Sequence, residues 1–355
     1  MPHRSVSFEA KYTSKPSPHI LKTLTEAVLD DESSKGTKVI VYSNHRTKIQ
    51  SFGDSLRKKL DSNKDTSNID AITLVGTLTK QEKAEYIRMF TNGSKTYPNY
   101  KVRVLCATSG VGNAGIDCRD VRIVYRMDFP PSLLDIAQEK GRAGRRPEAV
   151  ANDYHYIMCY SLDSLLHLYK RILDPKAELI NDSYRSKMLN DISAVAKLLV
   201  MPNVCLSTSL ELVMGRPRDR SNPIPNLQRC NSCSNCSQSK STFEPISKEG
   251  VKEILLNVFL KTFDGGMAKD TDNVVEFIRG YGNAQHILFK TKVKRFEPVR
   301  IKKLLFQMIA WSFLKVAYDK KLEIVVFELA TKGDRPSDLA IDNDDAWAYI
   351  TETNL

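Results

Sequence analysis

The sequence has no long apolar run. None of its 355 residues belongs to a stretch approaching the roughly 20 consecutive apolar residues of a membrane-spanning helix. Its first residues, Met-Pro-His-Arg-Ser, also lack the apolar core of a signal peptide. We therefore expect the seven cysteines to lie in a reducing compartment, where a cysteine cluster favours metal binding over disulfides.

Two signatures of nucleotide hydrolysis are also missing. No Gly-x-x-x-x-Gly-Lys-[Ser/Thr] occurs, which excludes a loop of that kind for cradling phosphates. No Asp-Glu-x-His or Asp-Glu-x-Asp box occurs to hold Mg²⁺ and position water. Because phosphoryl transfer needs the metal, the cradle and charge-stabilising side chains together, we expect that this chain does not hydrolyse ATP by itself.

Acidic residues are fewer than basic ones. Asp and Glu number 42 against 53 Lys and Arg, so the formal charge is +11 and the pI about 9.2. This excess favours a polyanionic partner, with nucleic acid as the first candidate. The chain is otherwise composed like a globular protein, with 41% hydrophobic and 27% charged residues, and its length allows two or three domains.

Short apolar runs alternate with helical patterns in the first half of the chain. Residues 1–20 are polar and suit a first strand or a linker. Further strands are predicted at 37–42, 69–75, 102–106, 121–125 and 154–160, and helices at 20–29, 49–60 and 80–90, the second capped by Ser43-Asn44. This alternation predicts an α/β fold with a parallel sheet and helices on both faces.

A glycine-rich loop follows the strand at 102–106. Ala107–Asp117 contains three glycines, Thr108 and Asp117. In an open α/β sheet the loops after the strands hold the ligand, and backbone N–H groups of such a loop can approach phosphate closely. The alternative is an ordinary surface loop.

Basic residues gather in Gln138–Arg146, whose sequence is Gln-Glu-Lys-Gly-Arg-Ala-Gly-Arg-Arg. A helix is predicted here because Ser132 can cap it, with Asp135 three residues later. If that helix continues, Gln138, Arg142 and Arg145 share one face. Two guanidiniums and an amide suit a polyphosphate, whereas the alternative is a solvated basic helix end.

Three segments resemble motifs of one family. Thr37–Asn44, Ala107–Asp117 and Gln138–Arg145 are similar, in this order, to motifs IV, V and VI of superfamily 2 helicases. Gln138–Arg145 resembles the RecQ version of motif VI, Gly115–Arg122 resembles the RecQ segment before it, and Arg4–Lys11 resembles the start of the domain. The resemblance implies a RecA-like second helicase domain of ordinary size, ~170 residues.

The resemblance also implies roles for individual residues. Arg142 and Arg145 would act on the γ-phosphate as transition-state arginines, with Gln138 beside them in the catalytic set. Asp117 and Gly115 would bind nucleotide, and Asp117 and Gln138 would sense its state. ATP and Mg²⁺ would be bound only in combination with a first RecA-like domain.

DNA contacts in this domain would come from Thr108, Ser109 and Asn44. Two positions depart from the family pattern: Asn113-Ala114 stands where the family has one residue, and Arg146 stands where an Asp is usual.

Four cysteines have the spacing of a metal site. Cys230-Asn-Ser-Cys233-Ser-Asn-Cys236 brings three thiolates within reach of one another, and Cys205 lies upstream. Four thiolates complete a tetrahedral Zn²⁺ site and leave no position for water, so we expect a structural zinc. The alternative is coincidental cysteines in a polar loop. The arrangement also resembles the RecQ zinc subdomain. Cys106, Cys118 and Cys159 are expected to be ordinary strand or loop residues.

Helical patterns dominate the second half. Met188, Ile192, Val195 and Leu199 have helical spacing, as do apolar residues in 251–259, 274–278 and 300–318, and 322–330 is predicted as a strand. Three helices and a strand hairpin describe a winged helix, which resembles the RecQ C-terminal domain. Lys292, Lys294 and Arg295 form a basic cluster that can contact DNA phosphates, with a solvated charged loop as the alternative.

These observations predict three parts: a second RecA-like domain at 1–172, a helical Cys₄ zinc subdomain at 173–243 and a winged-helix domain at 244–355. The resemblance implies the C-terminal portion of an ATP-dependent 3′–5′ DNA helicase. Its partners would be single-stranded and duplex DNA and ATP, with a separate first domain as a further candidate and no membrane. Its location would be the nucleus in a eukaryote and the cytoplasm otherwise. The alternatives are a zinc-stabilised DNA-binding module without enzymatic activity and an interaction protein with a helicase-derived fold.

Overall fold

The computed structural model describes sixteen segments of the chain, at residues 6–29, 38–62, 69–92, 101–112, 116–145, 154–176, 181–200, 205–213, 230–237, 243–245, 271–272, 274–275, 298–312, 314–321, 323–329 and 349–351. Two compact units make up the chain. The first unit comprises Met1–Tyr160 and Cys205–Ser237, and the second comprises Ser161–Val204 and Gln238–Leu355. Among the described helices, none is both long and apolar enough to cross a membrane.

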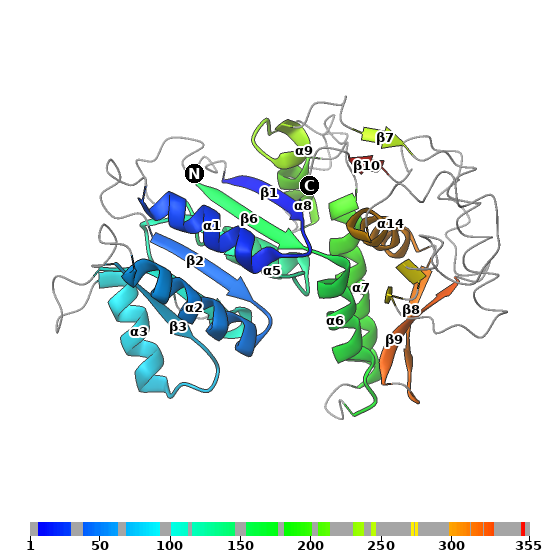
Figure 1. Ribbon diagram of the computed structural model, residues 1–355, viewed down its shortest axis with the longest axis horizontal. Coiled ribbons are helices and arrows are strands. Elements are labelled where there is room, and N and C mark those ends of the chain that lie inside the picture. The colour runs from blue at the N-terminus through cyan, green and yellow to red at the C-terminus, as the bar shows by residue number, and fades with distance from the viewer. Residues whose placement is uncertain are drawn as a thin grey trace, which may run out of the picture. The chain divides into compact units, whose positions relative to one another are not determined.

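A six-stranded parallel sheet forms the centre of the first unit (Figure 1). Its strand order is β1-β6-β5-β2-β4-β3, so β2 lies between β5 and β4 in the interior. The strands are β1 (Ser7–Tyr12), β2 (Lys38–Ser43), β3 (Ile69–Leu74), β4 (Lys101–Thr108), β5 (Val121–Arg126) and β6 (His155–Tyr160). The predicted parallel α/β sheet is confirmed, and the polar first segment is its edge strand.

Helices connect the strands of this sheet. They are α1 (Pro16–Leu29), α2 (Arg46–Asp61), α3 (Lys80–Asn92), the short α4 (Ser109–Gly112) and α5 (Leu133–Lys140). Two further helices of the first unit carry cysteines beside them: α8 (Leu206–Val213) follows Cys205, and α9 (Ser234–Ser237) contains Cys236.

Alternation along the strands divides the core between the two faces of the sheet. Val39, Val41 and Tyr125 point toward a buried apolar cluster that includes Ile20 and Leu24 of α1 and Ile49, Phe52, Leu56 and Leu60 of α2. Figure 1 shows α1 and α2 over that face. Since neighbouring residues of a strand point to opposite faces, Tyr42 and Arg126 point to the other face.

Of the two N-terminal helix caps predicted in this unit, one is confirmed and one is wrong. Ser132 caps α5 as predicted, because its Oγ accepts a hydrogen bond from the backbone N–H of Asp135 at 3.1 Å. The predicted cap of α2 at Ser43-Asn44 is wrong, since the N-cap is His45, which makes no side-chain capping bond. The Ser43 hydroxyl is bound instead to Asp128, and this competing partner explains the shift.

The second unit contains α6 (Leu162–Leu173), α7 (Asp182–Val200), α14 (Pro298–Ala310) and two antiparallel strand pairs. The pairs are β8 (Leu314–Asp319) with β9 (Ile324–Leu329), and β7 (Phe243–Pro245) with β10 (Tyr349–Thr351). The predicted helix containing Met188 and Leu199 is α7, and the strand predicted at 322–330 is β9.

The helix predicted at 300–318 is correct only in its first part. The helix α14 ends at Ala310, and Leu314–Asp319 is a strand. Ser312 takes a left-handed φ of 60°, which turns the chain, and β8 then pairs with β9. The predicted helix at 251–259 and most of the helix at 274–278 lie outside the described residues.

Candidate functional site

The candidate site lies at the carboxyl ends of three neighbouring strands, β5, β2 and β4. Ser43, Thr108 and Arg126 are the last residues of β2, β4 and β5. The chain leaves β4 on one side of β2 and enters β5 on the other, so the direction of connection reverses at β2. In open α/β sheets a ligand binds where the strand order reverses, outside the carboxyl ends of the strands.

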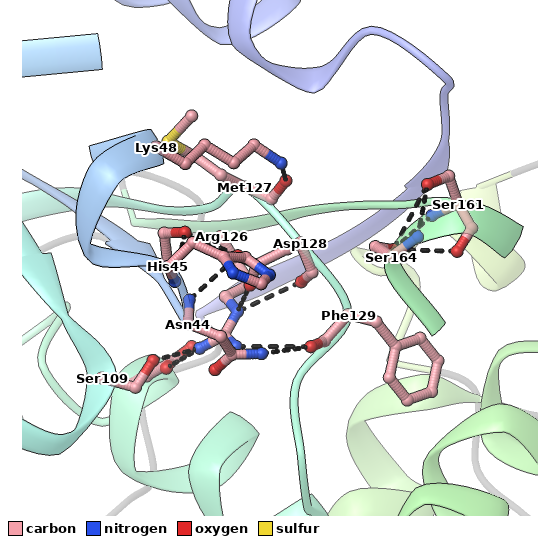
Figure 2. Close-up of polar contacts among 12 residues, drawn as sticks. Asn44, His45, Lys48, Ser109, Arg126, Met127, Asp128, Phe129, Ser161 and Ser164 are labelled. Atoms are coloured by element: carbon pink, nitrogen blue, oxygen red, sulfur yellow. Dashed lines mark hydrogen bonds and ion pairs between the residues drawn. The ribbon is translucent and has the colours of Figure 1, made fainter. Parts of the chain in front are cut away.

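Arg126 is the centre of a buried polar network at this edge (Figure 2). Its guanidinium is fully buried, and it donates from Nη1 to the Ser109 hydroxyl and to Glu139 Oε1, each at 2.5 Å. Its Nη2 donates to Asn44 Oδ1 at 2.5 Å. One side chain therefore joins the end of β2, the loop after β4 and helix α5.

Two carboxylates lie against the guanidinium of Arg126. Asp128 Oδ1 lies 2.9 Å from Arg126 Nε, and Glu139 Oε2 accepts a hydrogen bond from the Tyr156 hydroxyl at 3.0 Å. Burial raises the pKa of Glu139 to about 7, although the positive charge of Arg126 opposes this shift. Burial acts to lower the pKa of Arg126, but Glu139 and Asp128 outweigh it and the net shift is upward.

Asn44 and Ser109, two predicted DNA contacts, use their side chains within this network. Asn44 Nδ2 donates to the Phe129 carbonyl at 2.8 Å while its Oδ1 accepts from Arg126. Ser109 is 7% exposed, and its hydroxyl accepts from Arg126. Thr108, the third predicted contact, ends β4 and is partly buried. The side chains of Asn44 and Ser109 thus fix the segment after β2 and the start of α4.

Gln138, Arg142 and Arg145 do not share a helical face, so that prediction is wrong. The helix α5 ends at Lys140, with Gly141 as its C-cap, and both arginines follow in a turn. Gly144 has a φ of +71°, a left-handed conformation that favours glycine and redirects the chain before Arg145. Gln138 lies within α5 and is exposed.

Both arginines nevertheless converge on the C-terminal end of the glycine-rich loop Ala107–Asp117. Arg142 Nη1 donates to the Ile116 carbonyl at 2.7 Å, and Arg142 also bonds the phenol of the buried Tyr42, whose pKa is raised by burial. Arg145 Nη1 lies 2.7 Å from Asp117 Oδ1. Two guanidiniums are therefore held beside the loop that the sequence predicted to approach phosphate. Gly115, the remaining predicted residue of this loop, lies outside the described residues.

A second candidate site is formed by Cys205, Cys230, Cys233 and Cys236. Their sulfur atoms all lie within 4.8 Å of one another, with Cys230–Cys236 and Cys205–Cys233 each at 4.0 Å. Four thiolates around Zn²⁺ at Zn–S distances of about 2.3 Å would be separated by about 3.8 Å. The cysteines thus have the number, chemistry and spacing of a tetrahedral zinc site.

Hydrogen bonds to the sulfur atoms support this site. Cys205 Sγ accepts from the N–H and hydroxyl of Thr208 at 3.4 and 3.2 Å, and Cys230 Sγ accepts from the Cys233 N–H at 3.2 Å. Burial acts to raise the pKa of Cys230, but hydrogen bonds from Ser232 help lower it to about 6. Such bonds stabilise thiolates, which are the form that binds metal. As predicted, Cys106 and Cys159 are strand residues of β4 and β6 and Cys118 is a loop residue, and all three are buried outside this cluster.

Known proteins match the first unit. Residues 19–147 match the helicase conserved C-terminal domain. The chain is 32% identical over 111 residues to the ATP-dependent DNA helicase RecQ of Pasteurella multocida. This alignment covers 31% of this chain and 15% of the Pasteurella protein. It is 31% identical over 144 residues to the RecQ of Haemophilus influenzae. That alignment covers 41% of this chain and 19% of the Haemophilus protein. Residues 19–147 are therefore a helicase C-terminal domain, and the chain is similar in part to RecQ helicases.

Two further helicases are similar to parts of the chain. The ATP-dependent RNA helicase glh-1 of Caenorhabditis elegans is 32% identical over 108 residues, which covers 30% of this chain and 12% of that protein. The E. coli DEAD-box protein SrmB, solved in complex with a regulator of ribonuclease activity, is 21% identical to this chain. Its structural alignment covers 47% of this chain and 84% of the SrmB chain, with a TM-score of 0.35. Each curated match spans less than a fifth of its relative's length.

Three residues of this helicase region escaped prediction from the sequence. Arg126 and Asp128 follow the apolar run 121–125, and Glu139 lies inside the stretch that was singled out for its arginines. A charged residue at the end of an apolar parallel strand is the signal that could have pointed to Arg126. The predicted DNA contacts Lys292, Lys294 and Arg295 lie outside the described residues.

Proposed function

We propose that this chain is the C-terminal portion of a RecQ-like, ATP-dependent 3′–5′ DNA helicase. The observation that carries the proposal is the pair Arg142 and Arg145, which lie inside the helicase match and are both anchored on residues 116–117. Guanidiniums in such a position suit the charge that spreads over a γ-phosphate during transfer. RecQ relatives that carry the name ATP-dependent DNA helicase support DNA as the substrate.

In this proposal each residue of the loop and turn has its own role. Arg142 and Arg145 stabilise the transferring phosphoryl group, and Gln138, exposed on α5, faces the nucleotide beside them. Asp117 holds Arg145 by an ion pair until nucleotide competes for the guanidinium, and Gly115 admits the phosphate. The phosphate cradle and Mg²⁺ site come from a first RecA-like domain, on the same polypeptide or on another.

The arginine assignment is tested by measuring phosphate release with residues 1–355 and then with a first RecA-like domain added. We expect background release from residues 1–355, with or without DNA, because the sequence has neither the phosphate-cradle motif nor the Mg²⁺-binding box. With the first domain added, Arg142→Ala should lower DNA-stimulated turnover by about 10³-fold, the usual contribution of an arginine finger.

Arg57→Ala, an exposed arginine of α2, serves as the control and should leave turnover unchanged. DNA-stimulated release by residues 1–355 alone that disappears in Arg142→Ala would contradict the need for a first domain. Full turnover by Arg142→Ala in the completed enzyme would contradict the role of this arginine.

We also propose that Cys205, Cys230, Cys233 and Cys236 hold one structural Zn²⁺. Their four sulfur atoms fit the tetrahedral geometry, and a complete set of thiolates leaves no position for a reacting water. Metal analysis of the purified chain should return one zinc per chain, and Cys233→Ser, which alters a fully buried ligand, should lose it. A wild-type chain with much less than one zinc would refute the site.

Duplex binding by a winged helix completes the proposal, with Lys292, Lys294 and Arg295 on DNA phosphates. Thr108 at the end of β4, Ser109 at the start of α4 and Asn44 after β2 would lie next to the DNA backbone. The basic charge of +11 supports such a partner. The second candidate function is a zinc-stabilised DNA-binding module without a motor.

Binding to duplex DNA across a salt series separates the two functions. A helicase portion that is joined to its first domain should change its DNA affinity when ATP is added, whereas a simple module should show salt dependence alone. The absence of DNA binding even at low salt would exclude both functions.

A further inference from the structure

Lys140 lies at the junction of the two candidate sites. It is the last residue of α5, between Glu139 of the buried network and the turn that carries Arg142. Its Nζ lies 3.4 Å from the hydroxyl of Ser207, which is two residues after Cys205. Within the first unit, the end of α5 is thus connected to the start of the helix that follows a metal ligand.

The surroundings of Lys140 are both buried and negatively charged. Burial lowers the pKa of Lys140, while the charges of Glu211, Cys230, Cys205 and Cys233 oppose this shift. A Zn²⁺ ion bound to four thiolates keeps a net charge of −2, because the ligands bring four negative charges. A partly buried ammonium next to such a cluster is therefore placed to offset part of that charge.

The cysteine segment is attached to the sheet at a second place. The Ser7 hydroxyl donates to the Ser232 carbonyl at 2.6 Å, and the Ala10 N–H donates to the Ser234 hydroxyl at 3.2 Å. These bonds lie on the edge strand β1, so they hold the segment to the sheet without contacting α5. Lys140 supplies the charged contact to α5.

We propose that Lys140 is the counter-charge of the four-cysteine metal site, and that metal occupancy acts through it to hold the end of α5 and the following Arg142 in place. This inference rests on the proposed zinc site. Lys140 is then a positioning residue, since it reaches the nucleotide only through the turn at Gly141. Ser207 is its partner on the side of the metal.

Zinc affinity is the first readout, measured by competition with a chromophoric chelator. Lys140→Met keeps the length and most of the apolar stem but removes the charge, and it should weaken zinc binding about 10- to 100-fold, as the loss of an outer-shell partner does. Lys140→Arg, which keeps the charge, should stay near wild type. Lys58→Met, an exposed lysine in the last turn of α2, is the matched control and should have no effect.

A third variant separates the metal site from the nearby carboxylate. Glu211→Gln should leave zinc affinity within about twofold if the thiolates are the functional partner of Lys140, since the ligands remain intact. Zinc binding weakened as much in Glu211→Gln as in Lys140→Met would overturn the proposal, because Lys140 would then serve Glu211. Ser207→Ala, a smaller change, should weaken zinc binding a few-fold and carries the test if Lys140→Met does not fold.

Hydrogen exchange of residues 141–145 is the second readout. Removing zinc from the wild-type chain should speed exchange there about tenfold or more, and Lys140→Met at saturating zinc should reproduce most of that increase. Wild-type exchange in zinc-saturated Lys140→Met would overturn the link to Arg142. A wild-type chain that binds no zinc would instead refute the proposed metal site, so the two failures are distinguishable.

Discussion

Two arginine–carboxylate pairs of this protein share their chemistry and differ in burial. Arg126 contacts Glu139 at 2.5 Å, and both side chains are fully buried. Arg145 contacts Asp117 at 2.7 Å, but the two side chains are 33% and 78% exposed. Distance therefore does not separate the pairs, whereas access to solvent does.

This difference in solvent exposure gives the two ion pairs different roles. A buried charge that loses its partner is left without hydration, so the partners of Arg126 hold it and the surrounding loops in one arrangement. An exposed pair is worth little because water and salt compete for both ions. Arg145 can therefore exchange Asp117 for another anion at small cost, which suits the proposed contact with phosphate.

Removing the buried guanidinium should produce the largest effect. Arg126→Met leaves Glu139 and Asp128 buried without their common counter-charge and should lower the free energy of unfolding by about 3–5 kcal/mol. Urea denaturation measures the loss. Arg57→Met is the control, since Arg57 forms an equally short ion pair with Asp54 at 2.5 Å but in solvent, and it should cost about 1 kcal/mol or less. Equal losses in the two variants would show that burial does not distinguish them.

The buried pair should also give stability a dependence on pH. The carboxyl of Glu139 releases its proton near 4.5 in the unfolded chain and near 7 in the folded one, so the folded state binds more protons between these values. Stability should therefore fall as pH rises from 4.5 to 7, by an amount on the order of a few kcal/mol.

Urea midpoints across this pH range test the assignment to Glu139. Glu139→Gln carries no titrating proton and should flatten the decline. Parallel pH profiles for wild type and Glu139→Gln would exclude Glu139 as the source.

Backbone geometry near the exposed pair should matter more than the pair itself. Gly144→Ala places a methyl group 3.3 Å from Val6 Cγ2 and forces alanine into a φ of +71°, which should cost about 1–2 kcal/mol. Gly110→Ala is the control, because a Cβ there would meet nothing within 4 Å. Thermal unfolding of both variants gives the comparison, and an unchanged Gly144→Ala would mean that the turn relaxes freely.

The smallest effect is expected for the exposed ion pair. A double-mutant cycle with Arg145→Met and Asp117→Asn should give a coupling energy of about 0.2–1 kcal/mol at low salt, and less at high salt because the pair is screened. A coupling that is large and insensitive to salt would place Arg145 in the same class as Arg126.

Local sequence patterns were sufficient to predict most strands and helices of the first unit. The apolar runs at 37–42 and 102–106 became the buried central strands β2 and β4, since short β-branched runs without alternation need cover on both faces. The spacing of Cys230, Cys233 and Cys236 predicted a cluster that the folded chain completes with Cys205. The Ser132 cap was also visible in the sequence, because it involves residues only three positions apart.

Predictions that depended on where a helix ends were less accurate. The apolar spacing of 300–318 continued past Ala310, but Leu314–Asp319 found a strand partner in Ile324–Leu329. Periodicity alone does not reveal such a strand partner. Ser312 adopts a left-handed φ just after the helix, and because it is not a glycine the sequence gives no sign of this turn. The same limitation affected α5, whose end at Lys140 separates Arg142 from the face of Gln138.

The sequence by itself determined most strands and helices of the first unit, the cysteine triplet and the similarity to helicase C-terminal domains, because each depends on residues close together in the chain. The tertiary structure alone decided the role of Arg126, whose partners Glu139, Ser109 and Asn44 lie 13, 17 and 82 positions away. Strand order brings these residues to one edge of the sheet, and burial there converts an arginine at the end of a strand into the centre of the site. Local periodicity carries no information about strand order, so this centre existed only once the sheet was assembled.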